Sequence, residues 1–323
     1  MKEFSRKIDA HGHFGNSFLG PESRMEDYLP EARRIGVVGT IVSPGPTPEI
    51  ITAEGIYYPC LWRRDEMGKM TYFSQWSNPN GQVLRTKEAI ENPYKDVNEL
   101  LFRRIQKLNS VPSIFVMPIH HPKLDTAPGL KETLREYPTV ALKIHGISTF
   151  TGPEDVPDYT IDILKAEDKP LVVHTDMYRG KITHDVHEAY RLNDPVKWVE
   201  WSQETGVRTL ITHGARLSDK AIQLASRAEN IVIGIAPDIL LMSEPDRLAY
   251  KPDNYLEALL AMVPADKLVY DIDFGWNVSE RNQWETLDWQ MHERIIEAGY
   301  KIGLTDRAFE DIFFNNAVEF YNL

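Results

Sequence analysis

The sequence predicts an α/β fold of the (β/α)8 TIM-barrel class, and three observations support this prediction. First, eight short apolar segments rich in β-branched residues alternate with segments of helical periodicity. Second, no hairpin signal lies between these segments, so the strands should run parallel with right-handed crossovers. Third, nearly every expected strand ends in a histidine or an acidic residue, and in a barrel these ends meet at one mouth.

The expected strands cover residues 8–15, 36–43, 113–119, 139–145, 170–174, 208–213, 231–235 and 267–273. The expected helices lie near residues 23–35, 95–109, 129–136, 157–167, 195–205, 217–228, 254–262, 284–298 and 305–320. No glycine-rich dinucleotide fingerprint or phosphate loop follows the first strand. The sequence therefore favours a barrel over an open doubly wound sheet.

Residues 48–95 differ in character from the rest of the chain. They are rich in aromatic and charged residues, contain the turn sequence Asn78-Pro79-Asn80-Gly81, and show no sustained periodicity. Excursions of this length are usually functional. We expect a lid or subdomain inserted into a single domain that spans residues 1–323.

Composition excludes several classes of function. A formal net charge of −12 argues against a nucleic-acid surface and gives no sign of a basic membrane-binding helix. No apolar run reaches the roughly 20 residues of a membrane span, and the N-terminus lacks a signal-peptide hydrophobic region. Cys60 is the single cysteine, which fits a reducing compartment. We expect a cytoplasmic protein that acts on a small molecule, with a homo-oligomer left open.

Polar residues at the strand ends form one constellation. Alternate side chains of a strand share a face, so Asp9, His11 and His13 should point in one direction. The same alternation directs four later groups into the same cavity: Lys143 with His145, Val172 with His174, Ile211 with His213, and Asp271 with Asp273. Neutral imidazoles suit zinc and similar divalent ions. The sequence therefore predicts a metal centre at the mouth.

These motifs resemble those of the amidohydrolase superfamily. The resemblance is to its amidohydrolase-2 branch, which is related to aminocarboxymuconate-semialdehyde decarboxylase. It rests on residues 8–13, 142–145, 172–174, 211–214, 269–273 and 309–317, with Asn316 matching the asparagine of the family's last helix. One departure is Asp271, where the family usually has a small residue, followed by Ile272 in place of serine or threonine.

The resemblance and the chemistry imply one metal held by His11, His13, His174 and Asp273. Zn²⁺ is the simplest choice, with Mn²⁺ or Fe²⁺ as alternatives. The metal would bind water at an open coordination position and would lower the pKa of that water from about 15.7 towards about 7. Asp273 would then act as base and proton shuttle, and His213 would polarise the substrate carbonyl or orient the nucleophile.

Two residues near the ligands have less direct roles. We expect Asp9 to support a metal-bound histidine, since such histidines usually donate their other nitrogen to a carboxylate or carbonyl. In binuclear relatives a lysine at the position of Lys143 is carboxylated and bridges two ions, whereas in the mononuclear branch it stays unmodified. We favour one ion. An unmodified Lys143 could then pair with Asp271, which would neutralise both buried charges.

Five further residues are candidates for substrate binding: Arg216, Tyr178, Trp276, His145 and Arg63. The function expected is a metal-dependent hydrolase of an amide, ester or lactone. The first alternative is a metal-dependent, non-oxidative decarboxylase that uses the same ligands. The second is a barrel that binds a small molecule without catalysis.

Overall fold

The structure is a computed structural model that describes residues 4, 6–17, 20–108, 112–175, 184–236, 254–273 and 291–323. It describes the side chains of all of these except residues 16, 17, 20–23 and 184–187. The fold is mixed α/β with parallel sheets, and the chain alternates between strands and helices as the sequence predicts.

All the strands expected from the sequence are present, in two sheets. The first sheet has the order β2-β1-β3-β8 and comprises β1 (Lys7–Ser17), β2 (Gly20–Ser23), β3 (Val37–Pro44) and β8 (Ser113–Val116). The second has the order β13-β12-β11-β10-β9 and comprises β9 (Leu142–Ile144), β10 (Leu171–Val173), β11 (Thr209–Ile211), β12 (Ile231–Gly234) and β13 (Leu268–Val269). Every pair in both sheets is parallel except β1 with β2.

Backbone hydrogen bonds connect the edges of the two sheets. At one edge, Ala10 N donates to Tyr270 O (2.9 Å) and Asp273 N donates to His11 O (3.1 Å). At the other, Lys143 N donates to Pro118 O (2.9 Å) and His120 N donates to Lys143 O (2.8 Å). These contacts are isolated rather than part of a regular ladder, so the described strands form two sheets and not one continuous ring.

Two clusters of buried apolar side chains lie on the two sides of the parallel strands. A peripheral cluster fills the space between strands and helices, and includes Leu142, Leu171 and Ile211. A central cluster takes apolar side chains from every expected strand and from the C-terminal helix: Ile8, Ala10, Ile41, Met117, Ala141, Val172, Leu210, Val232, Val269, Ala317, Phe320 and Tyr321. The division between the clusters shows which way each strand residue faces.

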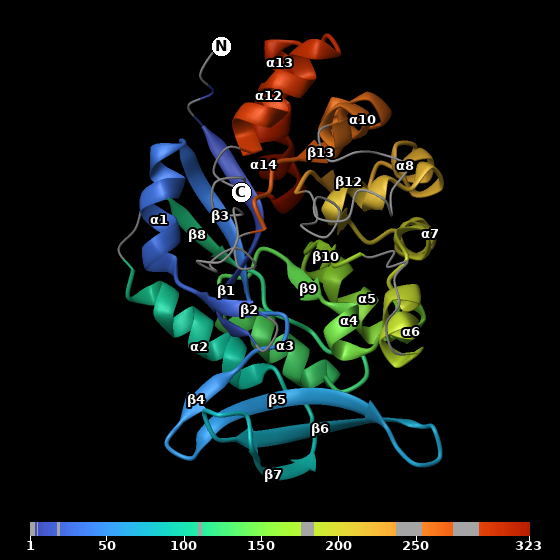
Figure 1. Ribbon diagram of the computed structural model, residues 1–323. Coiled ribbons are helices and arrows are strands. Elements are labelled where there is room, and N and C mark those ends of the chain that lie inside the picture. The colour runs from blue at the N-terminus through green and yellow to red at the C-terminus, as the bar shows by residue number, and fades with distance from the viewer. Residues whose placement is uncertain are drawn as a thin grey trace.

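Helices flank the parallel strands (Figure 1). They are α1 (Met25–Arg34), α2 (Lys95–Gln106), α3 (Ala127–Glu136), α4 (Gly146–Thr149), α5 (Asp158–Ala166), α6 (His184–Leu192), α7 (Pro195–Thr205), α8 (Asp219–Ala225), α10 (Tyr255–Met262), α12 (Met291–Lys301), α13 (Asp306–Glu310) and α14 (Asn316–Tyr321). Short 3₁₀ segments cover Pro153–Asp155, His213–Leu217 and Ala265–Lys267. No helix in these described ranges is both long enough and apolar enough to cross a membrane.

Local sequence explains where the helices begin and end. In α7, the Asp194 side chain accepts from Val196 N, Pro195 occupies the first turn, and Gly206 ends the helix at φ 71°. A π-helical turn, Asp311–Asn315, separates α13 from α14. The Ile312 carbonyl there accepts from Tyr270 N (3.0 Å), which ties the C-terminal helix to the residues that follow β13.

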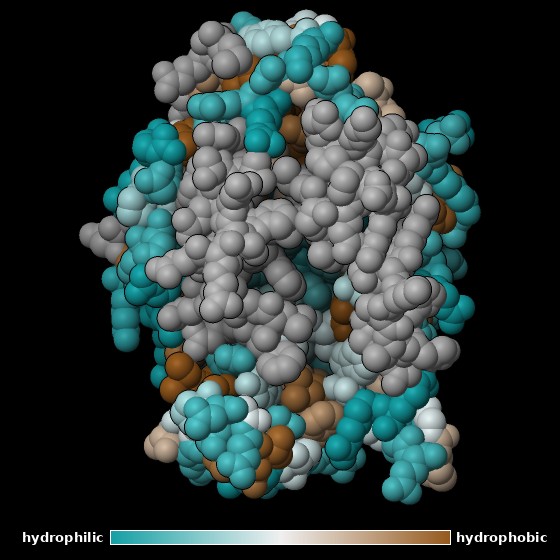
Figure 2. All heavy atoms as spheres, in the orientation of Figure 1, coloured by the Kyte–Doolittle hydropathy of each residue, from teal (hydrophilic) through white to brown (hydrophobic). Residues whose placement is uncertain are grey.

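The 48–95 region forms an antiparallel sheet that the sequence analysis did not predict. We call it the inserted sheet, with the order β4-β5-β6-β7: β4 (Ile50–Thr52), β5 (Gly55–Arg64), β6 (Met70–Ser77) and β7 (Val83–Glu88). It lies at one end of the molecule (Figure 1), where hydrophobic residues reach the surface (Figure 2). Aromatic residues occupy both faces of β5 and β6, so no period of two is visible in their sequence.

Candidate metal centre

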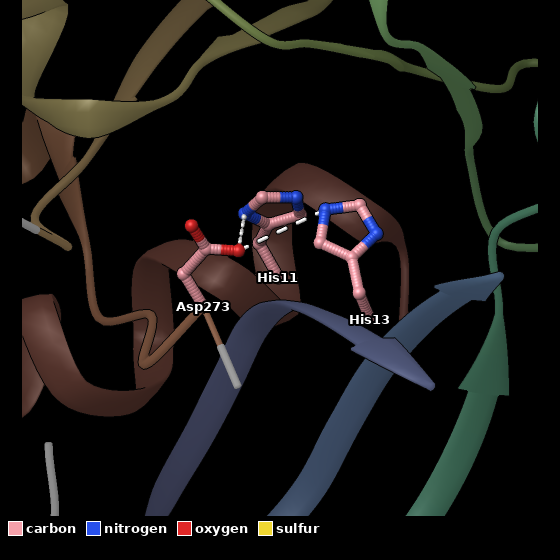
Figure 3. A group of neighbouring side chains, drawn as sticks. All are labelled: His11, His13 and Asp273. Carbon is pink, nitrogen blue, oxygen red and sulfur yellow. Dashed lines mark ion pairs between the residues drawn. The ribbon is translucent and has the colours of Figure 1, made fainter. Parts of the chain in front are cut away.

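Three predicted ligands come together beside the middle of β1. His11, His13 and Asp273 each offer one donor atom, and these atoms all lie within 4.8 Å of one another (Figure 3). Asp273 Oδ1 lies 3.5 Å from His11 Nδ1 and 3.7 Å from His13 Nε2. Both imidazoles are buried, and the Asp273 side chain is 13% exposed. Two nitrogens and a carboxylate in a largely buried site form a donor set that suits a divalent ion such as zinc.

The tautomer of His13 follows from its hydrogen bonds. His13 Nδ1 lies 2.9 Å from the carbonyl oxygen of Pro44 and 2.8 Å from Ser43 Oγ. Because a carbonyl oxygen can only accept, Nδ1 carries the proton and Nε2 keeps its lone pair. His13 is therefore oriented to bind a metal through Nε2.

Burial keeps the histidines of the centre neutral. Desolvation lowers the pKa of His13 to about 3, and it lowers the pKa of His11 well below the ordinary value. Burial lowers the pKa values of His145, His174 and His213 in the same way. Neutral imidazole is the form that binds metals, so these rings have the charge state that metal binding needs at neutral pH.

Asp9 does not share a face with the two histidines, contrary to the sequence prediction. A bulge between Asp9 and Gly12 shifts the register of β1 against β3. Asp9 instead accepts from Tyr28 Oη in α1 (2.6 Å) and from Ile272 N (2.9 Å). Burial raises the pKa of Asp9 to about 6. Asp9 thus supports the chain beside Asp273 rather than an imidazole.

Asp273 has a left-handed backbone. Its φ is +53°, a conformation that is uncommon for residues other than glycine, asparagine and aspartate. Its backbone nitrogen donates to His11 O (3.1 Å), and the preceding Ile272 is held by Asp9. These contacts fix the carboxylate beside the His11 ring.

Lys143 contacts a predicted ligand rather than Asp271. Its Nζ lies 2.7 Å from His11 Nε2, and the described residues contain no ion pair between Lys143 and Asp271. The expected Lys143–Asp271 pair is therefore wrong. Burial lowers the pKa of Lys143 to about 7. Burial also raises the pKa of Asp271 well above the ordinary value, and its Oδ1 accepts from Ala236 N.

His213 reaches the centre by a route that strand alternation does not give. Ile211 belongs to the peripheral cluster, so regular alternation would turn His213 away from the site. The chain instead makes a left-handed turn over His213–Leu217, in which every residue has a positive φ. This turn places His213 Nδ1 3.7 Å from Asp273 Oδ2.

His174 lies next to the three-residue group rather than within it. Its Nδ1 is 2.9 Å from His213 Nε2, and its ring centroid is 4.1 Å from that of His145. The His145 ring is 6.3 Å from that of His13. The structure therefore gathers five histidines, but His11 and His13 are the ones that share a possible ion position with Asp273.

Two buried imidazole nitrogens, His11 Nδ1 and His213 Nδ1, make no hydrogen bond to the described residues, which supports a bound cation. Among the described residues, the buried atoms His11 Nδ1, His213 Nδ1 and Asp271 Oδ2 make no hydrogen bond. Buried polar atoms are normally satisfied, because an unmade hydrogen bond there costs about 1–3 kcal/mol. A cation would satisfy the imidazole nitrogen, so the residues present fit a divalent metal.

The candidate substrate-binding residues separate in space. Arg216 is buried on the left-handed turn and donates from Nε to Thr175 O (2.9 Å). Arg63 lies on β5 with its guanidinium over the Phe73 ring, 4.8 Å from its centroid, and is exposed. The structure therefore does not bring Arg63 to the centre. Tyr178 and Trp276 lie outside the described residues.

Sequence analysis missed the residues that orient the ligands. Ser43 and Pro44 end β3 beside His13, and Ser148 contacts His145. A hydroxyl at the end of a strand next to a ligand strand was the available signal for Ser43. The Pro44 contact uses a backbone carbonyl, which leaves no signature in sequence.

Comparison with known proteins gives structural matches alone. No protein-family model matches the sequence. No curated protein matches it. An amidohydrolase from Burkholderia multivorans, solved with bound HEPES, superposes with a TM-score of 0.56 at 13% identity, covering 98% of this chain and 99% of that one. Enamidase, described as a member of the amidohydrolase superfamily, gives 0.59 at 11% identity, covering 98% of this chain and 67% of that one. A TatD homologue from Escherichia coli gives 0.50 at 16%, covering 99% of both chains. These matches show a shared fold.

Proposed function

We propose that this protein is a metal-dependent hydrolase of the amidohydrolase type. The observation that carries the proposal is the convergence of buried donor atoms from His11, His13 and Asp273 at the end of a parallel sheet. Similarity in fold to an amidohydrolase and to enamidase supports the same reaction class. The substrate would be a small molecule with an amide, ester or lactone carbonyl.

The centre would hold one divalent cation, most simply Zn²⁺, with Mn²⁺ or Fe²⁺ as alternatives. His11, His13 and Asp273 would supply ligands, and His174 would complete the set from its place beside His213. When bound, the cation would lower the pKa of water towards about 7 and supply hydroxide at neutral pH. Lys143, with its amine against His11, would remain an unmodified residue in a centre of one ion.

The chain's own residues would carry the protons. Asp273 would accept a proton from the attacking water at its carboxylate and return it to the leaving nitrogen or oxygen. His213, 3.7 Å from Asp273 Oδ2, would orient the substrate carbonyl. The water oxygen bonds to the carbonyl carbon and the carbon–leaving-group bond breaks, so atoms and charge balance. Arg216 would lie at the rim of this site as a positively charged substrate contact.

We also propose that the two parallel sheets form one closed eight-stranded barrel. The backbone hydrogen bonds at both sheet edges and the central cluster, which draws on every strand, support closure. The barrel would be a single domain of residues 1–323, and the inserted sheet would form one wall of its mouth. Exposed Ile51, Val83 and Leu84 on that sheet offer apolar surface for a homo-oligomer.

Two alternatives lead to different products. A non-oxidative decarboxylase would use the same ligands on a carboxylic acid and release carbon dioxide. A barrel without catalysis would bind a small molecule and release nothing. The second is less well supported, because His11 Nδ1 and His213 Nδ1 are buried and make no hydrogen bond to any described residue.

Turnover of a small panel of test substrates distinguishes these functions. Protein loaded with Zn²⁺ or Mn²⁺ would be assayed with activated esters, lactones and aromatic carboxylates, with carbon dioxide measured in parallel. We expect metal-dependent hydrolysis of an ester or lactone. Carbon dioxide release from a carboxylate would favour the decarboxylase, and a metal-free, inactive protein would favour the binding barrel.

A further inference from the structure

Two histidines of the centre have opposite hydrogen-bonding environments. The Nδ1 atom of His13 faces a carbonyl oxygen, whereas the Nδ1 atom of His145 faces the backbone N–H of Ser148 (3.3 Å) and the Ser148 hydroxyl (2.8 Å). A backbone N–H can only donate, so His145 Nδ1 must accept. In a neutral imidazole the proton then sits on Nε2.

The Nε2 atom of His145 is buried and has no hydrogen-bond partner among the described residues. The residue is 2% exposed, and its ring lies against His174 and near His13. A protonated Nε2 cannot bind a metal but can donate a hydrogen bond. A donor that is buried without a partner costs stability unless a ligand satisfies it.

We propose that His145 donates from Nε2 to the substrate oxygen on which negative charge develops, and that the inserted sheet holds it in place through α4. The inference rests on the proposed hydrolase function and deepens it, since it assigns a donor role to one histidine of the centre. Preorganised donors of this kind are among the largest contributions to catalysis.

The inserted sheet contacts the residues directly after His145. Trp62 Nε1 donates to Ile147 O (3.0 Å), and the Trp62 ring packs on Phe150 at a centroid distance of 4.8 Å. Tyr72 Oη donates to Phe150 O (3.4 Å). His145 is itself the N-cap of α4, so a shift of this turn would move its ring. Trp62 is therefore a positioning residue.

The other side of this turn leaves no room for movement. A Cβ at Gly146 would lie 2.0 Å from Asn193 Oδ1 and 2.4 Å from Thr151 O. Asn193 is fully buried and donates to Ala189 O (2.8 Å). The turn that carries His145 is thus clamped between the inserted sheet and the α6–α7 connection.

Two substitutions of His145 test the donor role. His145→Asn keeps a side-chain acceptor near the Nδ1 position but lacks the Nε2 donor, whereas His145→Gln places an amide N–H near Nε2. With p-nitrophenyl acetate and γ-butyrolactone as probes, His145→Asn should lower kcat about 100- to 1000-fold with a smaller change in KM. His145→Gln should recover part of that loss. Both variants should bind as much Zn²⁺ as the wild type.

A double-mutant cycle tests the positioning role of Trp62. Trp62→Phe should lower kcat about 10-fold in the wild type and change nothing further in the His145→Asn variant. Trp76→Phe, on the same sheet but stacked on Tyr57, is the matched control and should leave kcat unchanged. Equal effects of Trp62→Phe in both backgrounds would overturn the coupling.

A readout independent of turnover is the tautomer of His145. Two-bond ¹H–¹⁵N correlation spectra should show Nε2–H for His145 and Nδ1–H for His13. An Nδ1–H tautomer at His145, or loss of Zn²⁺ in His145→Asn, would overturn the inference. Equal Zn²⁺ binding and equal turnover in the wild type and in His145→Asn would also overturn the inference. A wild type that neither binds Zn²⁺ nor turns over a probe would instead refute the proposed function.

Discussion

The backbone N–H of Asp273 donates to the carbonyl oxygen of His11 at 3.1 Å, so the last predicted ligand is hydrogen-bonded to the first. Asp273 also has a positive φ of 53°, and its Oδ1 lies 3.5 Å from His11 Nδ1. Two distant segments of the chain are therefore joined at the candidate metal centre.

The contact between Ser43 and His13 should tune metal affinity. Ser43→Ala removes one of two partners of His13 Nδ1 and leaves the Pro44 carbonyl. We expect Zn²⁺ affinity to fall about 10-fold, at the lower end of the effects seen for residues that orient ligands. Competition with a chromophoric chelator measures this. Ser148→Ala is the control, because that serine contacts His145, and it should not change the affinity; equal losses in both variants would contradict the assignment.

The left-handed turn at His213 should not tolerate a side chain at Gly214. Gly214 has a φ of +58°, and a Cβ there would lie 2.0 Å from Tyr255 Oη. Gly214→Ala should therefore destabilise the protein by about 2–4 kcal/mol and reduce turnover through displacement of His213. Gly303→Ala is the control. Gly303 has a φ of +86° and nothing lies within 4 Å of its added Cβ, so this variant reports backbone strain without a steric clash.

Denaturation by urea measures the free energy of unfolding of both variants. Gly303→Ala should cost about 1 kcal/mol and leave turnover intact. If the two variants lose equal stability, the close packing of Tyr255 on the turn is not what requires glycine.

His121 should make stability depend on pH. It packs between Tyr72 of the inserted sheet and Tyr94, and burial lowers its pKa to about 3 from the ordinary value of 6.5. Above pH 6.5 His121 is neutral in both the folded and the unfolded chain, so it does not make the free energy of unfolding depend on pH. Between pH 6.5 and 3 the unfolded chain alone binds the proton, so the free energy of unfolding falls as the pH falls.

The slope from this one residue is about 1.4 kcal/mol per pH unit. His121→Phe keeps the packing and cannot titrate, so its free energy of unfolding should fall less steeply between pH 6 and 4. Urea titrations at several pH values measure the difference. Parallel slopes for the wild type and His121→Phe would show that the histidine is not kept neutral by the fold.

The position of Arg63 predicts a silent substitution. Arg63 and Trp62 are neighbours on β5 and therefore point to opposite faces of the inserted sheet, with Trp62 on the face that contacts α4. Arg63→Gln should change kcat/KM less than twofold, within the range of a surface substitution. A loss of tenfold or more would place Arg63 at the substrate.

Much of the fold could be predicted because its signals are local. Apolar, β-branched runs marked every parallel strand, and helices such as α7 began and ended with ordinary capping residues. The histidines and acids at the strand ends predicted that His11, His13 and Asp273 would come together. Strands β5 and β6 escaped prediction because aromatic residues lie on both of their faces.

The details of the centre depend on departures from regular geometry. The bulge after Asp9 and the left-handed turn at His213 each reverse the face that alternation assigns. The proton position on His13 depends on the Pro44 carbonyl, which every residue type would supply. Such features arise from tertiary contacts, so a pattern of residue types does not contain them.

Metal content in the Asp273→Asn variant tests the central claim most directly. Asparagine tolerates the left-handed backbone of Asp273 and matches its shape, so the variant removes the charge with little other change. Elemental analysis after loading with Zn²⁺ and desalting should give about one ion per wild-type chain and almost no metal in Asp273→Asn. The wild-type chain should carry no added carboxyl mass on Lys143. Equal metal in the two proteins would show that His11, His13 and Asp273 do not form the metal centre.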